Sequence, residues 1–132
     1  MTTSVFTKMI KGEYPCYKVF EDEWTFAFLA RETLQEGHTL IVPKIEIDNY
    51  LDLPEPYYSK IFSNSKLLAK AIQQVTNCKR VGTVTGGWDI PHFHYHLVPM
   101  YNFDDLDPRK AKQRTKEEYL EMQNKIVNAL TI

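Results

Sequence analysis

The sequence predicts an α+β fold, and three observations lead to this prediction. Short stretches rich in β-branched and aromatic residues recur along the 132-residue chain. A long segment in the middle repeats its apolar residues at helical spacing. The strand-like stretches are joined by few long crossovers, which favours antiparallel pairing. Residues 1–132 are therefore expected to form one domain with a sizeable core, with residues from about 101 to 132 as a C-terminal extension ending in a helix.

The first half of the chain contains a short helix and three strands. The predicted ranges are a helix over residues 4–13 and strands over residues 17–20, 24–29 and 39–42. Phe6, Met9 and Ile10 share one side of the helix, and Gly12 marks its end. The polar residues 21–23 between the first two strands are typical of a hairpin turn.

The second half contains two more helices and two more strands. The predicted ranges are a helix over residues 58–77, strands over 80–85 and 92–100, and a helix after Thr115. The long helix has small or apolar residues at spacings of three and four, namely Tyr58, Ile61, Ser65, Leu68, Ile72 and Val75. The spacing of Thr115 and Glu118 predicts a capping box. The helix that follows carries the apolar stripe Tyr119, Met122, Ile126 and Leu130.

Composition and charge exclude several classes of protein. The formal net charge of -1 provides no basic surface for polymeric nucleic acid or an anionic membrane. The N-terminal residues have no apolar core of signal-peptide length, and no stretch approaches a membrane span. We therefore expect a cytoplasmic protein. Cys16 and Cys78 lie far apart, so we expect reduced thiols rather than a disulfide framework or a cysteine-built zinc site.

Three of the four histidines occupy alternate positions in the stretch PHFHYHLVP, residues 91–99. In a β-strand, alternate side chains point to opposite faces. His92, His94 and His96 would therefore line one face of the strand. The other face would carry apolar side chains, namely Phe93, Tyr95 and Leu97. The pattern predicts a chemical site on one side and a packed core on the other.

Two kinds of chemistry suit this pattern. A neutral imidazole is a competent nucleophile toward phosphorus, and neighbouring imidazoles can stabilise charge or hold its tautomer. The middle position, His94, is the natural nucleophile. Metal binding is the competing interpretation, although a rise of ~3.3 Å per residue places His92 and His96 about 13 Å apart. Two of the three histidines together with His38 could still hold an ion. A nucleotide-binding or phosphate-binding module with little turnover is a third alternative.

These residues resemble the histidine triad (HIT) family of nucleotide hydrolases and transferases. Residues 92–98 match the family signature, in which three histidines alternate with apolar residues. The likeness extends to earlier segments in the same order, namely Phe6 with Lys8, residues 12–15, 21–22, 27–29, 37–44 and 79–82. The combination of Gly37-His38-Thr39 with the triad is far more specific than either segment alone.

The resemblance implies an α+β fold with a five-stranded antiparallel sheet and two main helices, joined to a second copy as a two-fold homodimer. It implies attack on the α-phosphorus of a small nucleotide derivative, without a metal or other cofactor. His94 matches the nucleophile, which would form a nucleotidyl-histidine intermediate. His96 and His38 match the phosphate-side histidines, and His92 matches the residue that orients the nucleophile.

The resemblance also implies the residues that bind substrate. A backbone N–H at Gly87 would approach a phosphate oxygen. The base pocket would be walled by Phe6, Met9, Phe28 and Leu40, for each of which plain core packing is the alternative. Trp88 and Asp89 would lie near the leaving group. Asp89 could orient an imidazole or bind an amine leaving group.

The chain departs from the family pattern at three places. Relatives commonly have an aspartate for the ribose hydroxyls where this chain has Ala30, although Glu32 could substitute or Arg31 could engage an anion. Some relatives carry a zinc-binding Cys-x-x-Cys motif where this chain has Ser4 and Thr7, which excludes zinc binding through that motif. The basic segment over residues 108–114 could reach a polyphosphate, or simply face solvent.

Overall fold

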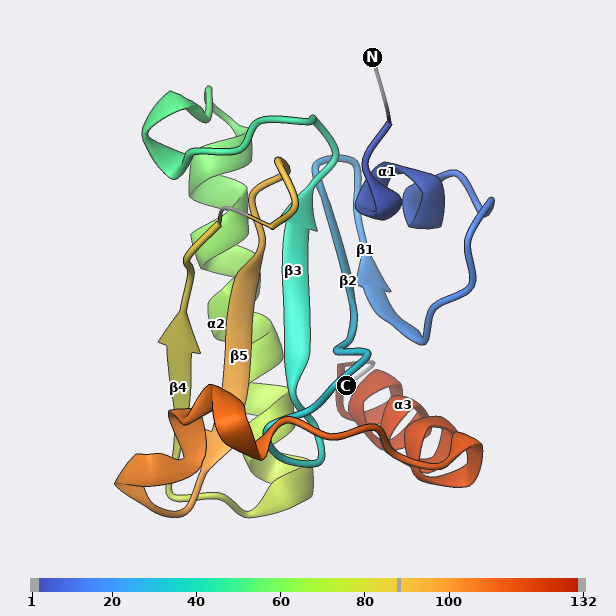
Figure 1. The fold of residues 1–132 in the computed structure, drawn as a ribbon, viewed down its shortest axis with the longest axis vertical. Helices are drawn as coiled ribbons and strands as arrows, with labels where there is room; N and C mark the ends of the chain where they lie inside the picture. Colours follow the sequence, from blue (N-terminus) through green and yellow to red (C-terminus); the bar gives the residue numbers. More distant parts are fainter. Residues whose placement is uncertain (1–2, 88, 131–132) are drawn as a thin grey trace.

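The computed structural model describes residues 3–87 and 89–130 (Figure 1). Its strands are β1 (Lys18–Glu21), β2 (Thr25–Leu29), β3 (Thr39–Pro43), β4 (Arg80–Val84) and β5 (Tyr95–Met100). Its α-helices are α1 (Val5–Ile10), α2 (Tyr57–Thr76) and α3 (Lys116–Leu130). The strands form one antiparallel sheet in the order β1-β2-β3-β5-β4. The prediction of a five-stranded antiparallel α+β fold is therefore confirmed.

The sheet separates two apolar clusters. The long helix α2 covers one face and packs its fully buried Ile61, Leu68 and Ile72 against the sheet (Figure 1). The short helix α1 covers part of the other face through the buried Phe6, which packs with Phe26, Phe28, Ala30, Leu40 and Val42. Alternation along the strands explains this division, because successive side chains of β2 and β3 enter opposite clusters. The α1 side of the sheet is the face on which the histidines lie.

Two details of the predicted elements are wrong. Strand β5 begins at Tyr95 rather than at His92. In the observed register Tyr95 pairs with Ile41, so Phe93 would face Pro43, which has no N–H to donate. The N–H of Phe93 instead donates to the carbonyl of Ile47 at 2.7 Å. The second error is Tyr58, which belongs to the predicted apolar stripe of α2 but is 40% exposed.

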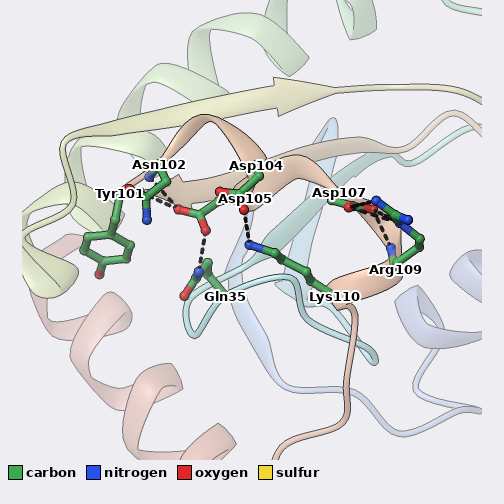
Figure 2. A network of polar contacts seen from close by, with 8 residues as sticks. All are labelled: Gln35, Tyr101, Asn102, Asp104, Asp105, Asp107, Arg109 and Lys110. Atoms are coloured by element: carbon green, nitrogen blue, oxygen red, sulfur yellow. Dashed lines mark hydrogen bonds and ion pairs between the residues drawn. The ribbon is translucent and has the colours of Figure 1, made fainter.

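The C-terminal segment folds back onto the loop between β2 and β3 (Figure 1). Thr33 in that loop pairs with Lys112 through two backbone hydrogen bonds of 2.8 and 3.0 Å. The buried carboxylate of Asp105 accepts from the N–H groups of Tyr101 and Asn102 and from the Gln35 amide (Figure 2). This segment therefore holds the loop that leads into His38.

The remaining predictions about elements and cysteines can be compared directly with the structure. The predicted capping box at the start of α3 is present, with Thr115 N–H donating to Glu118 and Glu118 N–H donating to Thr115. Cys16 is half-buried and Cys78 is buried, and both are free thiols. Within the described residues, no helix combines the length and the apolar character needed to cross a bilayer. The cytoplasmic location stays a prediction.

Candidate active site

Two apolar side chains and a histidine lie in one row across three neighbouring strands. Phe28 of β2 pairs with Leu40 of β3, and Leu40 pairs with His96 of β5. Directly paired residues of neighbouring strands project to the same face of a sheet. The three side chains therefore lie side by side on the face that α1 covers. His38 lies two residues before Leu40 and projects to the same face.

His94 is held in one tautomer by the backbone. Its Nδ1 lies 2.8 Å from the carbonyl oxygen of His92, and its side chain is buried. A carbonyl can only accept, so the proton of the neutral ring is on Nδ1. The Nε2 lone pair is therefore available for attack on an electrophile. The Nε2 atom lies 3.7 Å from the carboxylate of Asp89.

His92 is fully buried and has a partner on each ring nitrogen. Its Nε2 lies 2.8 Å from the carbonyl of Pro43, and its Nδ1 lies 2.7 Å from the Ser4 hydroxyl. The ring must donate from Nε2, so Ser4 donates to Nδ1. Ser4 is in turn fixed, because its own N–H donates to Glu46 at 2.7 Å. His92 thus presents its backbone carbonyl to His94 in a defined orientation.

His38 and His96 form a second chain of hydrogen bonds. The N–H of Leu34 donates to Nδ1 of His38 at 3.0 Å. Nε2 of His38 lies 2.9 Å from Nδ1 of His96. Because the backbone N–H can only donate, His38 carries its proton on Nε2 and donates it to His96. The remaining proton of His96 is therefore on Nε2, where it can be donated to a ligand.

Burial keeps these rings neutral. Desolvation, with a smaller contribution from nearby His96, lowers the pKa of His38 to about 3. Desolvation, with a smaller contribution from nearby His94, lowers the pKa of His96 to about 4. The pKa of His92 is also lowered, chiefly by burial. At neutral pH these rings act through the hydrogen-bond donors and acceptors assigned above rather than as cations.

The predicted base-pocket residues gather beside the histidines. Phe6 contacts both the histidines and the other pocket residues, because its ring centroid lies 5.2 Å from that of His94 and 5.5 Å from that of Phe28. Leu40 is buried in the same cluster, and Met9 is partly buried against it. Ala30 is also buried there, so the position at which relatives commonly have aspartate is apolar. These residues form one apolar cluster beside the histidines, and their role in binding a base stays a prediction.

The loop before the histidines contains three further predicted site residues, of which two are described. Asp89 is adjacent to His94, although its side chain is 71% exposed. Gly87 has a φ of 120°, in the region that favours glycine, and lines a pocket of about 310 Å³ together with Asp48 and Thr85. Thr85 donates to the carbonyl of His94 at 2.9 Å, which ties this pocket to the site. Trp88 lies outside the described residues.

Other predicted candidates lie outside the histidine cluster. Glu32 is exposed. Arg31 is also exposed and donates to the Tyr14 hydroxyl at 3.0 Å. Within the basic segment, Arg109 pairs with Asp107 and Lys110 pairs with Asp104 (Figure 2). Arg114 differs from these two basic residues, because it donates to the Thr33 hydroxyl and lines a pocket together with Arg31.

Sequence reasoning missed the groups that orient the imidazoles. Three of these are the backbone groups of Leu34, Pro43 and His92, which carry no sequence signal. Ser4 was noted only as the replacement of a cysteine, although its position as the cap of α1 was a usable signal. Among the described residues, no three His, Cys, Asp or Glu side chains converge in the manner of a metal site.

This geometry combines a buried ring nitrogen that has a free lone pair with a neighbouring N–H donor and an aromatic wall. A model described as the HIT domain matches residues 11–103 of the chain. An uncharacterized HIT-like protein of Borreliella burgdorferi is 29% identical over 125 residues, which cover 89% of each protein. Adenosine 5′-monophosphoramidase of Saccharomyces cerevisiae is 33% identical over 96 residues, covering 72% of this chain and 61% of the yeast protein.

A solved structure agrees with these relatives. The crystal structure of a hypothetical histidine triad nucleotide-binding protein from Sulfolobus tokodaii is 28% identical and has a TM-score of 0.85, covering 96% of this chain and 91% of that chain. The matched residues 11–103 include all five strands and all four histidines. The chain belongs to the HIT-domain family.

Proposed function

We propose that the protein hydrolyses a nucleotide derivative at its α-phosphorus through a covalent nucleotidyl-histidine on His94. The observation that carries this proposal is the hydrogen bond from Nδ1 of His94 to the carbonyl of His92, because it leaves the Nε2 lone pair for attack. A neutral imidazole of this kind is a nucleophile at neutral pH.

The proposed reaction has two displacements. In the first, the Nε2 lone pair of His94 forms a bond to phosphorus while the bond from phosphorus to the leaving group breaks. The leaving group departs with that electron pair and takes a proton from water, which has access at the exposed Asp89. In the second, water attacks phosphorus, the bond to Nε2 breaks, and the proton of the water passes to solvent. A transferase would use a second phosphate in place of this water.

His96 stabilises the charge that develops on the phosphoryl oxygens. Its Nε2 proton is held in place because Nδ1 already accepts from His38. His38 is itself fixed by the N–H of Leu34, so neither ring needs to change its tautomer during the reaction. A fixed donor of this kind contributes ~3 kcal/mol to the stability of a transition state. The backbone N–H of Gly87 is the second proposed donor.

The proposed substrate is a nucleoside phosphoramidate. The yeast relative is named as an adenosine 5′-monophosphoramidase, which supports a P–N bond as the bond that breaks. The apolar wall of Phe6, Phe28 and Leu40 suits a flat base or its sugar. Ala30 is buried among apolar side chains at the position where relatives commonly have a ribose-binding aspartate, so discrimination by the ribose hydroxyls would be weak.

Trapping the intermediate tests this proposal. Wild-type protein quenched during turnover of guanosine and adenosine phosphoramidates should carry a nucleotidyl adduct detectable by mass spectrometry. The His94→Ala variant should carry no adduct and should lose turnover. Activity should persist after chelation, because no step of the proposed reaction uses a metal ion. Binding without turnover would favour the nucleotide-binding module, and loss of activity on chelation would favour a metal-dependent hydrolase.

We also propose that the active form is a homodimer. Strand β4 lies at the outer edge of the sheet, and its Val84 is 44% exposed. Beside it, the rings of Tyr58, Phe62 and Tyr95 form a partly exposed row with centroids 5.1 and 5.2 Å apart. A second copy would cover this edge and this row in a self-complementary contact. Light scattering that reports only the mass of a 15.5 kDa monomer would overturn this proposal.

A further inference from the structure

A second pocket opens beside the apolar wall of the site. It has a volume of about 450 Å³ and lies between the loop after α1, the end of β2 and the start of the C-terminal helix. Met9 and Phe28 line it and also belong to the wall beside the histidines. Phe28 is two strands from His96, which places the near side of the pocket about 10 Å from the histidines. This distance is similar to the distance between the 5′-phosphate and the base within one nucleotide.

The pocket has flat aromatic walls. Besides Phe28, it is lined by Tyr17 and Tyr119, whose rings stack with centroids 4.7 Å apart and planes 9° apart. Aromatic walls of this kind favour a flat ring over a flexible chain or a sugar. The occupant that best fits the position and the walls is therefore a nucleobase.

The charged side chains that line this pocket are both arginines. One guanidinium N–H of Arg31 donates to the Tyr14 hydroxyl, and Arg31 forms no ion pair among the described residues. Arg114 donates its Nε to Thr33 at 2.7 Å and has Glu36 only at 3.9 Å. No carboxylate lines the pocket within the described part of the chain. The polar end of this pocket is therefore rich in donors.

Bases differ in what they offer to such donors. Guanine presents two neighbouring acceptors, O6 and N7, that match the fork of an arginine, whereas adenine presents an amino donor at position 6. Hypoxanthine shares O6 and N7 with guanine. An adenine amino group facing Arg31 would leave donor against donor.

We propose that this pocket selects 6-oxopurine nucleotides over adenine nucleotides, with Arg31 as the residue that reads O6 and N7. The inference rests on the proposed function only in placing the phosphate at His94 and His96. It adds the class of base that the enzyme accepts. Arg114 supports the same selection by keeping a second positive charge beside the acceptors.

Calorimetric binding of nucleoside monophosphates tests the selection without requiring turnover. Wild-type protein should bind GMP and IMP about tenfold more tightly than AMP, the range expected of one forked arginine contact. The analogue 7-deaza-GMP, which lacks the N7 acceptor, should lose most of that advantage. Equal affinity for GMP and AMP would overturn the inference, and so would the absence of any nucleotide binding.

Two variants separate base reading from simple charge attraction. Arg31→Gln should weaken GMP binding about tenfold and leave AMP binding nearly unchanged. Arg31→Lys keeps the charge but loses the fork, so it should behave like Arg31→Gln. The matched control is Arg109→Gln, which removes an exposed arginine outside the pocket and should change neither affinity. Equal weakening of both nucleotides by Arg31→Gln would mean that Arg31 attracts the phosphate only.

Failure of this inference can be told apart from failure of the proposed function. Turnover of guanosine and adenosine phosphoramidates at equal kcat/KM, with an adduct on His94, would retain the function and reject the base selection. Preferential binding of GMP without turnover of either phosphoramidate would retain the selection and reject the function.

Discussion

At the scale of single residues, the rings of His94 and His38 are oriented by backbone groups that cannot change their role. The His92 carbonyl can only accept from His94, and the Leu34 N–H can only donate to His38. Side-chain hydroxyls and carboxylates could rotate or titrate, whereas these backbone groups cannot. The direction of each hydrogen bond is therefore set by the fold.

The Ser4 hydroxyl is the side chain that hydrogen-bonds His92 in the described part of the chain, so we expect the Ser4→Ala variant to impair turnover. It should lower kcat about tenfold with little change in KM, because Ser4 touches His92 and not the substrate. Losing the hydroxyl also opens Nδ1 of His92 to protonation. The acid limb of the pH profile of kcat/KM should therefore move to higher pH.

Two control variants accompany this measurement. Ser4→Thr keeps the hydroxyl and should restore both the rate and the pH profile. Ser63→Ala removes an exposed hydroxyl on α2 and should change neither. A variant Ser4→Ala that keeps the wild-type pH profile, even with reduced stability, would mean that Ser4 only caps α1.

The limits of sequence reasoning are clearest at this scale. Alternation in the stretch 91–99 correctly predicts that the histidine rings lie on the opposite side from Phe93 and Tyr95. These two rings stack on each other and pack in the cluster that contains α2. The partners of those rings could not be predicted. They are backbone groups of segments distant in sequence, such as Pro43 and Leu34, and only the register of the folded chain brings them close.

At the scale of elements, the C-terminal segment acts as a clamp on the loop between β2 and β3. Asp105 is the centre of this clamp (Figure 2). We expect Asp105→Ala to lower the free energy of unfolding by about 2 to 3 kcal/mol, because two backbone N–H groups and the Gln35 amide lose a buried acceptor. Chemical denaturation followed by circular dichroism measures this change.

The neighbouring carboxylate provides a matched control. Asp104 pairs with Lys110 in solvent, and its side chain is 63% exposed. Asp104→Ala should therefore lower the free energy of unfolding by less than about 1 kcal/mol. Equal losses in the two variants would contradict the clamp and indicate a general effect of removing negative charge from this segment.

Element boundaries were predicted unevenly. The long helix follows from periodicity, because one of its faces is buried in a core. The five strands follow from their β-branched and aromatic residues. The onset of β5 was misplaced because pairing ends where the partner strand reaches Pro43, and this depends on register. Tyr58 was misassigned because its aromatic ring packs on Phe62 at the surface rather than in the core.

At the scale of the whole molecule, the neutral histidines make stability depend on pH. The ordinary pKa of histidine is 6.5, while the folded values are about 3 for His38 and about 4 for His96. The unfolded chain therefore binds more protons than the native state below pH 6.5. Each such group contributes stability that is fully present above that pH and falls by about 1.4 kcal/mol per unit below it.

We therefore expect the free energy of unfolding to fall as the pH is lowered from 7 to 5. Urea denaturation at several pH values measures the slope. The His38→Asn and His96→Asn variants should each show a shallower slope, since each removes one titrating group. A free energy of unfolding that stays constant from pH 7 to pH 5 would contradict the lowered pKa values.

The clamp also has a consequence for how the protein is made. The loop that carries Leu34 and leads to His38 is held by residues that follow Met100, so the site is not assembled from the matched residues 11–103 alone. During synthesis the N-terminal part emerges from the ribosome first. A nascent chain whose residues 101–112 are still inside the ribosome would have its sheet but no fixed His38.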